Sequence, residues 1–529
     1  MRLRILYIVI TFCVSFVVNI CAQQGNYTLT KDYVWGVDQM VNDTAVSFQT
    51  FIKPYRYEEL NELHDTTVFI PSLFKAIKPK YAIAIPKKVM VQAYPILTTQ
   101  FGFQSSPNRY LNDVLFGGNI LGNIGEKLTF NAKVLAGQGV YNNAIDSVIV
   151  NSSVVPGLGY AYGYTSRRNP QLPTYSYQYA SGYLSYSPNK VFNLQLGRDK
   201  HFWGDGYRSL FLSDVAAPYA FFKVTTSIWK LKYVNLFTAM KDASQASGLK
   251  SDRLNKYASF HYLGWDITRR LNVGLFEAVV WQGDDAVRKR GYDITYLNPI
   301  MFFRPAEFSL GSSDNVLIGV NAKLKLFKKQ QLYGQMLLDE FVFAELKNRT
   351  GWWGNKYAFQ VGAKSFDMFK LKHLNLLMEY NYARPYTYAH GSSQQNYTHL
   401  NQALAHPLGA NFKEAVVLVN YNYKRWFIEA KAVYATYGLN ENGINYGKDI
   451  AISYATNRPG EYGHEITQGL HTELLVAAIR GAYIIDADIN LKLETGVALR
   501  KESNAIGEKN SPYVFIGIRT DLTNLYDDF

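Results

Sequence analysis

An alternating segment in the second half of the chain reads Val316-Leu317-Ile318-Gly319-Val320-Asn321-Ala322-Lys323-Leu324-Lys325-Leu326. Successive side chains of a β-strand point to opposite faces, so the even-numbered positions form an apolar face and the odd-numbered positions from Gly319 onward a polar one. A strand of about ten residues with two such faces can cross a bilayer within a β-barrel, with lipid against its apolar face. We therefore expect a transmembrane β-barrel whose polar faces line the lumen.

The same alternation recurs along the chain, for example at 374–382 and 491–499, and two kinds of connection separate the segments. Tight, mostly basic turns alternate with long connections, which is the pattern of periplasmic turns and extracellular loops in outer-membrane barrels. The tight turns lie at 187–190, 229–232, 268–270, 328–330, 369–372, 423–426 and 485–488. The long connections lie near 199–218, 241–254, 282–314, 341–354, 383–411, 437–469 and 500–512.

The fold class is accordingly all-β, an antiparallel barrel over residues 96–529 with about eighteen strands, or about sixteen if the first hairpin belongs to a plug. The first three strand candidates lie near 97–104, 109–121 and 126–137. Residues 23–95 carry frequent prolines and one helix-compatible piece near 57–63. Proline disfavours strand ladders, so we interpret this segment as a periplasmic cap or a plug.

The first residues resemble a secretory signal. Arg2 and Arg4 precede an apolar run over 5–20 and a small-residue cleavage site after Ala22, so residues 1–22 would be removed. Lipidation at Cys21 is the alternative. Both cysteines, Cys13 and Cys21, lie in this segment, so we expect neither disulfides nor thiol catalysis in the mature protein. We expect the mature protein to reside in the outer membrane.

Composition supports the same class. Aromatic residues make up 15% of the chain and include 41 tyrosines, which suits the girdles that flank a lipid-facing band. The formal net charge is +13, but the cations gather at tight turns rather than on a helix, so we expect no nucleic-acid partner. The inner girdle is predicted beside the tight turns, at Trp229, Tyr233, Trp265, Phe327, Phe369, Tyr423 and Trp426.

The connection that follows the strand at 192–197 is dense in charged, aromatic and glycine residues. Arginine forks, carboxylates and flat apolar rings together suit a polar ring-shaped ligand such as a sugar. The alternative is a loop that folds inward and pairs its own charges. The candidate polysaccharide-binding residues here are Arg198, His201, Trp203, Asp205, Tyr207 and Arg208.

Two further connections have a similar character and add Arg304, Arg384, Tyr386 and His390 to the candidates. Histidines 390, 399 and 406 share one connection, but their spacing matches no metal-binding pattern. Ser209 lies near His201 in sequence without the G-x-S-x-G turn of a serine hydrolase. We expect no catalysis, no metal and no cofactor.

The stretches 196–214, 296–315 and 384–414 resemble the capsule-assembly Wzi family, most closely its RemB branch of gliding motility proteins from Bacteroidetes. The run G-R-D-x-x-F-x-G-D-G-Y-R-S-L at 197–210 is its most specific part. The resemblance implies a barrel of about eighteen strands with a helical N-terminal portion. It also implies surface attachment of capsule or slime polysaccharide, with a role in adhesion or gliding.

The implied partners are surface polysaccharide, outer-membrane lipid and gliding or adhesion proteins, and we expect a monomer. A diffusion channel and a protein-binding component of the motility machinery are the alternatives. The charged and aromatic connections 199–218, 282–314 and 383–411 are suited to folding inward, so we expect the barrel to pass little solute.

Overall fold

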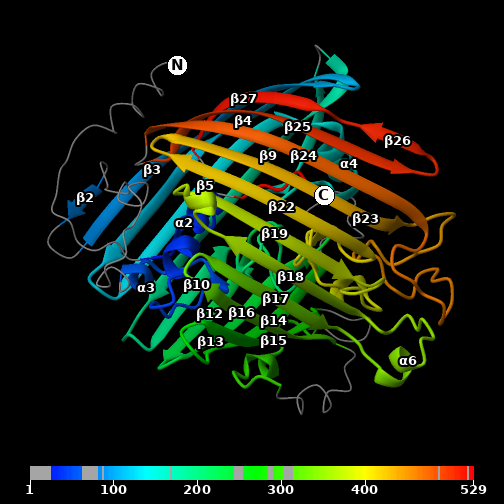
Figure 1. The fold of residues 1–529 in the computed structure, drawn as a ribbon, viewed down its shortest axis with the longest axis horizontal. Helices are drawn as coiled ribbons and strands as arrows, with labels where there is room; N and C mark the ends of the chain where they lie inside the picture. The colour runs from blue at the N-terminus through cyan, green and yellow to red at the C-terminus, as the bar shows by residue number, and fades with distance from the viewer. Residues whose placement is uncertain are drawn as a thin grey trace.

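The computed structural model describes residues 25–61, 82–85, 89–166, 169–243, 254–283, 290–302, 314–486, 489–520 and 524–529. The predicted signal peptide, residues 62–81 and Arg304 lie outside these ranges. The described chain forms a closed antiparallel barrel of 18 strands, which confirms the larger of the two predicted counts. Each strand pairs with its neighbours along the chain, and β27 pairs with β3 to close the sheet (Figure 1).

The barrel strands follow one another in chain order. They are β3 (Val89–Ser105), β4 (Asn108–Ile124), β5 (Leu128–Val140), β9 (Asn169–Tyr186), β10 (Phe192–Asp199), β12 (Tyr219–Ile228), β13 (Leu231–Asp242), β14 (Leu254–Asp266), β15 (Leu271–Gln282), β16 (Asn315–Phe327), β17 (Gln330–Leu338), β18 (Tyr357–Ser365), β19 (Leu374–Ala383), β22 (Phe412–Tyr423), β23 (Trp426–Leu439), β24 (Leu470–Asp486), β25 (Leu491–Asn504) and β27 (Tyr513–Thr520).

Shorter elements extend or accompany the barrel. The strands are β1 (Ile52–Lys53), β2 (Ala82–Ile85), β6 (Val154–Val155), β7 (Gly159–Tyr160), β8 (Tyr162–Ser166), β11 (Phe202–Trp203), β20 (Thr398–His399), β21 (Gln402–Ala403) and β26 (Gly507–Asn510). The helices are α2 (Lys31–Val41), α3 (Tyr57–Asn61), α4 (Asn143–Ser152) and α6 (Phe343–Lys347), with 3-10 turns η3 (Ile294–Leu297), η4 (Met368–Lys370) and η5 (Ser393–Gln395).

Two boundaries differ from the expected ones. Strand β3 starts at Val89 and contains Pro95, which pairs only with β4 because β27 reaches no further than Thr98. Proline lacks an N–H but is tolerated on an edge that needs no donor. The expected connection over 500–512 is in large part a hairpin, in which β26 pairs with the end of β25.

Strand β16 shows how the alternation sets the two faces. Asn321, Lys323 and Lys325 point into the lumen and are buried, whereas Val320 and Leu324 point outward and are 50% and 37% exposed. This confirms the predicted assignment of lipid and lumen. The lumenal side chains are buried because the lumen itself is filled by chain. Of the predicted girdle, Trp229 and Phe369 are 79% and 82% exposed beside their turns.

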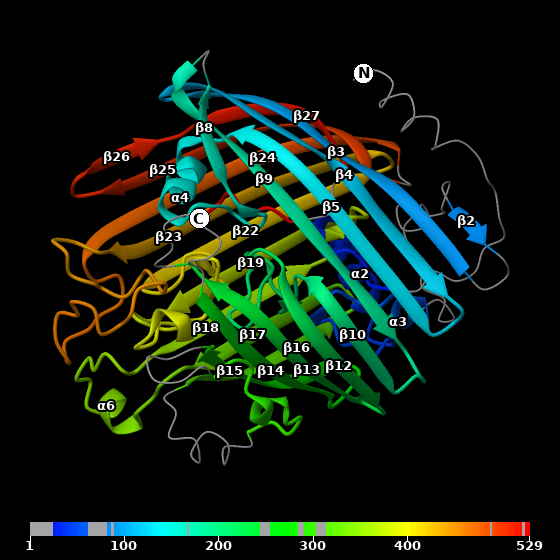
Figure 2. The same cartoon turned by 180° about the vertical axis from the view of Figure 1, so that it is seen from behind.

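Residues 25–61 lie inside the barrel near the end that carries the tight turns (Figure 2). Asp32 of α2 pairs with Arg480 and Lys492 of the wall at 2.6 and 2.7 Å. Asn42 donates to the backbone carbonyl of Lys328, in a tight turn, at 3.1 Å. Figure 1 shows α2 and α3 within the barrel at this end and α6 at the opposite end. The segment therefore occupies the lumen at the end that carries the tight turns.

Two of the long connections fold into the lumen as expected, and they bond to each other. Tyr388 of the connection 384–411 donates its hydroxyl to the carbonyl of Leu210 at 2.9 Å. The backbone N–H of Ser213 donates to the carbonyl of Leu404 at 2.7 Å. The largest apolar cluster forms where these connections meet the inner faces of β13 to β15.

The connection between β15 and β16 takes a different path from the expected one. Its described part, residues 290–302, lies against the outer wall. Tyr296 packs on Trp281 with ring centroids 4.6 Å apart, and Phe302 donates its backbone N–H to Glu277 at 2.9 Å. Trp281 and Glu277 share the outward face of β15 with the exposed Leu275. The prediction that this connection folds inward is therefore wrong for its described residues.

The cause is a polar interruption of the outward face. His261 and Glu277 are cross-strand partners on outward positions, and the next outward pair along the strands is Leu263 with Leu275. Beside them, the Tyr233 hydroxyl accepts the N–H of Met301 at 3.0 Å and donates to the carbonyl of Pro299. Irregular backbone at membrane depth requires such partners, because lipid offers none.

Candidate functional site

The loop 199–218 is held between the N-terminal segment and the inner wall. Trp203 pairs through its backbone with Ile52, and its indole ring is fully buried. The edge of that ring meets Phe260 and Phe276, both at 6.0 Å between centroids. Trp203 thus connects the loop 199–218 to both the N-terminal segment 25–61 and the barrel wall.

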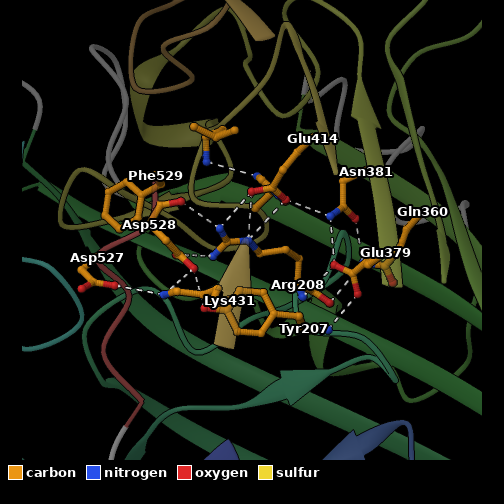
Figure 3. Close-up of polar contacts among 12 residues, drawn as sticks. Tyr207, Arg208, Gln360, Glu379, Asn381, Glu414, Lys431, Asp527, Asp528 and Phe529 are labelled. Carbon is orange, nitrogen blue, oxygen red and sulfur yellow. Dashed lines mark hydrogen bonds and ion pairs between the residues drawn. The ribbon is translucent and has the colours of Figure 1, made fainter. Parts of the chain in front are cut away.

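Tyr207 and Arg208 reach into a polar centre of the lumen (Figure 3). The Arg208 guanidinium contacts the carboxylates of Glu414 at 2.9 Å and Asp528 at 3.0 Å. The backbone N–H groups of Tyr207 and Arg208 both donate to Glu379, at 2.7 and 3.0 Å. The Tyr207 hydroxyl donates to Asp528 at 2.6 Å.

The charges in this centre belong to separate parts of the chain. Lys431 of β23 pairs with Asp528 at 2.9 Å, and His406 contacts Glu414 at 2.7 Å. Burial disfavours the charged carboxylate, but Arg208 and Lys431 outweigh it and hold the pKa of Asp528 well below its usual range. The loop therefore folds inward, as one of the two sequence interpretations expected. It pairs with the wall and the segment 524–529 rather than with its own charges.

The remaining candidates of this stretch lie apart. Arg198 continues the outward face of β10 and donates to the carbonyl of Pro218 at 3.1 Å. His201 is buried against the ring of Phe221, with centroids 4.6 Å apart. Asp205 is buried and accepts a hydrogen bond from the Thr50 hydroxyl of the plug.

Arg384, Tyr386 and His390 gather at the extracellular end, away from Arg208. Arg384 donates to the carbonyl of His464 at 3.2 Å. The fully buried Tyr386 donates its hydroxyl to the carbonyl of Asn445 at 2.8 Å. These three candidates form a supporting layer beneath residues that are more exposed.

That more exposed layer consists of Trp352, Trp353, Tyr454, Arg458 and Glu461, which we call the rim cluster. The Arg458 guanidinium lies 3.9 Å from the ring centroid of Trp353, and the Trp353 indole N–H donates to Glu461 at 2.6 Å. The rings of Trp353 and Tyr454 are 4.6 Å apart. Hydrogen bonds from Arg458 and Trp353 lower the pKa of Glu461, which keeps it charged.

The supporting layer meets the rim cluster edge to face. Tyr386 approaches Trp353 at 6.2 Å, and His390 approaches Tyr454 at 5.6 Å between ring centroids. Sequence reasoning found this lower layer but missed the rim cluster. The sequence feature that indicates the rim cluster is Gly351-Trp352-Trp353-Gly354, which lies inside a long connection. Tryptophan in such a connection is not needed to pack a hydrophobic core.

The three histidines of the connection 384–411 have separate surroundings. His399 accepts from the backbone N–H of Lys241 at 3.1 Å, whereas His406 contacts Glu414 and His390 packs on Tyr454. In the part of the chain that the structure describes, no group of three or more histidine, cysteine or acidic residues is placed to hold a metal ion.

A closed barrel with an apolar outer face, a girdled wall and long connections at one end defines an outer-membrane β-barrel protein, here with its lumen filled by its own chain. Its fold is similar to that of Wzi from Escherichia coli, described as an outer-membrane protein involved in group 1 capsule assembly and a carbohydrate-binding β-barrel. That match has a TM-score of 0.61 and 14% identity, and it covers 94% of this chain and all of Wzi.

Two other solved structures match less well. OprD from Pseudomonas aeruginosa has a TM-score of 0.44 at 10% identity, over 84% of this chain and 96% of OprD. OccAB2 from Acinetobacter baumannii has a TM-score of 0.42 at 10% identity, over 81% of this chain and 97% of its own. No family model and no curated protein sequence matches the chain. The closer resemblance to RemB stays a prediction.

Proposed function

We propose that this outer-membrane barrel attaches exported polysaccharide, capsule or slime, to the cell surface through the rim cluster. The observation that carries the proposal is the pairing of half-buried tryptophan rings with an arginine and a carboxylate at the extracellular end. Sugar rings present apolar C–H faces and a rim of hydroxyls, which stacking aromatic rings and charged hydrogen-bonding groups complement. The carbohydrate binding stated for Wzi supports the same ligand class.

The rim cluster is suited to binding because it is held in place before a ligand arrives. Arg458 is positioned over Trp353, while Tyr386 and His390 fix the tryptophan and tyrosine rings from below. Side chains with fixed rotamers lose little conformational freedom on binding. A surface of this kind can bind sugar units of a long polymer with little loss of side-chain freedom.

A diffusion channel fits the described lumen less well. Residues 25–61, the loop 199–218, the connection 384–411 and the segment 524–529 all occupy it through direct bonds to one another or to the wall. We therefore keep a low steady conductance as an expected property of the intact protein. The adhesion or gliding role and the protein-binding alternative rest on the sequence resemblance alone and stay predictions.

Trp353→Ala tests the proposal in cells. Removing one stacking ring should weaken binding by about 1–3 kcal/mol, roughly a ten- to hundredfold loss of affinity. Cell-bound polysaccharide should fall and released polysaccharide should rise, with the protein still present in the outer membrane. Trp229→Ala is the matched control, because Trp229 is exposed at a periplasmic turn. Equal retention in both variants would refute the rim cluster as the attachment site.

A further inference from the structure

Two of the cavities inside the lumen lie in series, both beside the wall that includes β3, β4 and β5. The larger measures about 260 Å³ and reaches Asn112 and Asn142, at the extracellular ends of β4 and β5. The smaller measures about 140 Å³ and reaches Tyr94 and Asn490, near the periplasmic ends of the wall. Together they extend along most of the height of the barrel.

The lining of both cavities is polar enough to keep them wet. Charges of both signs face the larger cavity, among them Asp113, Glu429 and Arg480. Lys133 and Asp199 face the smaller one, together with several tyrosines. A cavity of about 10–15 Å³ can hold one water molecule, so each of these two cavities has room for several water molecules. Cavities that stay dry are lined by apolar groups throughout, whereas charged side chains stand among the apolar lining of these two cavities.

A partition separates the two cavities, and of the residues that the structure describes Asn524 lines both. Its amide N–H group donates to the carbonyl of Leu29 and to the carboxylate of Asp214, both at 2.7 Å. Its amide oxygen accepts the backbone N–H of Lys31 at 2.9 Å. One side chain thus ties the segment 524–529 to the N-terminal segment across the gap.

The Lys31 ammonium completes the partition. It lies 3.3 Å from the ring centroid of Tyr207 and 4.1 Å from that of Tyr526, and it donates to the carbonyl of Tyr207. The segment 524–529 is itself held by Asp528, through Arg208 and Lys431. The same segment is also bonded through Tyr526, whose hydroxyl donates to Asp214 at 2.6 Å, and through Asp527, which contacts Tyr513 at 2.6 Å and Lys431 at 3.2 Å, so these contacts must also change when the partition opens.

We infer that the barrel contains a closed pathway for small hydrophilic solutes, made of these two cavities and gated by Asn524. Movement of the segment 524–529 would join the cavities into one water-filled passage. The balanced charges of the lining favour small neutral solutes and monovalent ions of either sign over strongly charged ones. This pathway is separate from the rim cluster and does not depend on polysaccharide binding.

Planar-bilayer recording of the purified full chain in KCl tests the gate. The unmodified protein should stay closed, whereas Asn524→Ala should show a small steady conductance. Asn119→Ala is the matched control, because Asn119 lines the smaller cavity away from the partition and bonds to Asn131. Heat-modifiable migration on gels verifies that each barrel is folded.

Cysteine substitution gives a second variant and locates the path, since both natural cysteines lie at positions 13 and 21, in the predicted signal. Asn524→Cys should conduct, and a bulky methanethiosulfonate reagent should close it again. In the Asn524→Ala background, modification of Lys133→Cys or Asp113→Cys should reduce the current, while Leu196→Cys on the outer wall should not. Closed behaviour of folded Asn524→Ala and Asn524→Cys, or current insensitive at both cavity positions, would overturn the inference.

Discussion

Arg208→Ala provides the sharpest test of how the loop 199–218 is held. The guanidinium is fully buried and bridges Glu414 and Asp528. Removing one partner of a buried ion pair typically destabilises a fold by 3–5 kcal/mol, because a charge is left without compensation. Here Glu414 keeps His406 and Asp528 keeps Lys431, so the cost falls toward the lower limit.

We therefore expect the free energy of unfolding to fall by about 3 kcal/mol, more than a hundredfold in the folding equilibrium. The assay is reversible denaturant unfolding of the barrel in detergent micelles. Arg198→Ala is the matched control, since that arginine lies on the outer face and makes one hydrogen bond to Pro218; it should cost no more than about 1 kcal/mol.

A double variant separates loss of charge compensation from loss of packing. Glu414→Gln removes one of the charges that Arg208→Ala leaves behind, so the combined variant should be less destabilised than the sum of the two single variants. Additive losses would mean that the two residues do not interact. An Arg208→Ala protein as stable as the unmodified barrel would refute the description of this network as the support of the lumenal loop.

Two further outcomes follow from other parts of the chain. Burial lowers the pKa of Lys31 from 10.5 to about 7, so the unfolded state binds more protons than the folded state between pH 7 and pH 10.5. The free energy of unfolding should therefore rise with pH across that window. Lys31→Met should flatten this rise, and an unchanged slope would contradict the burial of the ammonium. Ile300 is 59% exposed on the segment that lies against the outer wall, where its side chain would face lipid. On intact cells, Ile300→Cys should therefore resist a membrane-impermeant maleimide that labels Ala455→Cys at the extracellular end. Equal labelling of the two variants would place the segment 290–302 in water.

The barrel could be predicted from sequence because its determinants are local. The alternation of residues 316–326 assigns each side chain to lipid or lumen without knowledge of any partner strand. Tight and long connections then give the direction of every strand. The same argument explains why the prediction that the connection 282–314 folds into the lumen was wrong for its described residues. Its outer-wall path involves His261 and Glu277, two polar residues that interrupt the apolar outer face.

The candidate site was less accessible to sequence reasoning because its contacts are long-range. Nothing near Arg208 in sequence identifies Glu414 or Asp528 as its partners, and without them a charged loop cannot be told from a ligand site. Trp353 is missed for a related reason. The chain contains many aromatic residues that belong to the girdles, and only the contact with Arg458 distinguishes Trp353 from them. That contact joins the connection after β17 to the connection after β23, so it is not visible in the local sequence.

Binding of the purified barrel to the polysaccharide released by its own cells tests the central claim most directly. Biolayer interferometry on immobilised protein would compare the unmodified chain with Trp353→Ala and Trp229→Ala. The unmodified barrel and Trp229→Ala should bind with the same affinity, and Trp353→Ala should bind roughly ten- to a hundredfold more weakly. Absence of binding by the folded unmodified barrel, or equal affinity of all three proteins, would contradict attachment of polysaccharide through the rim cluster.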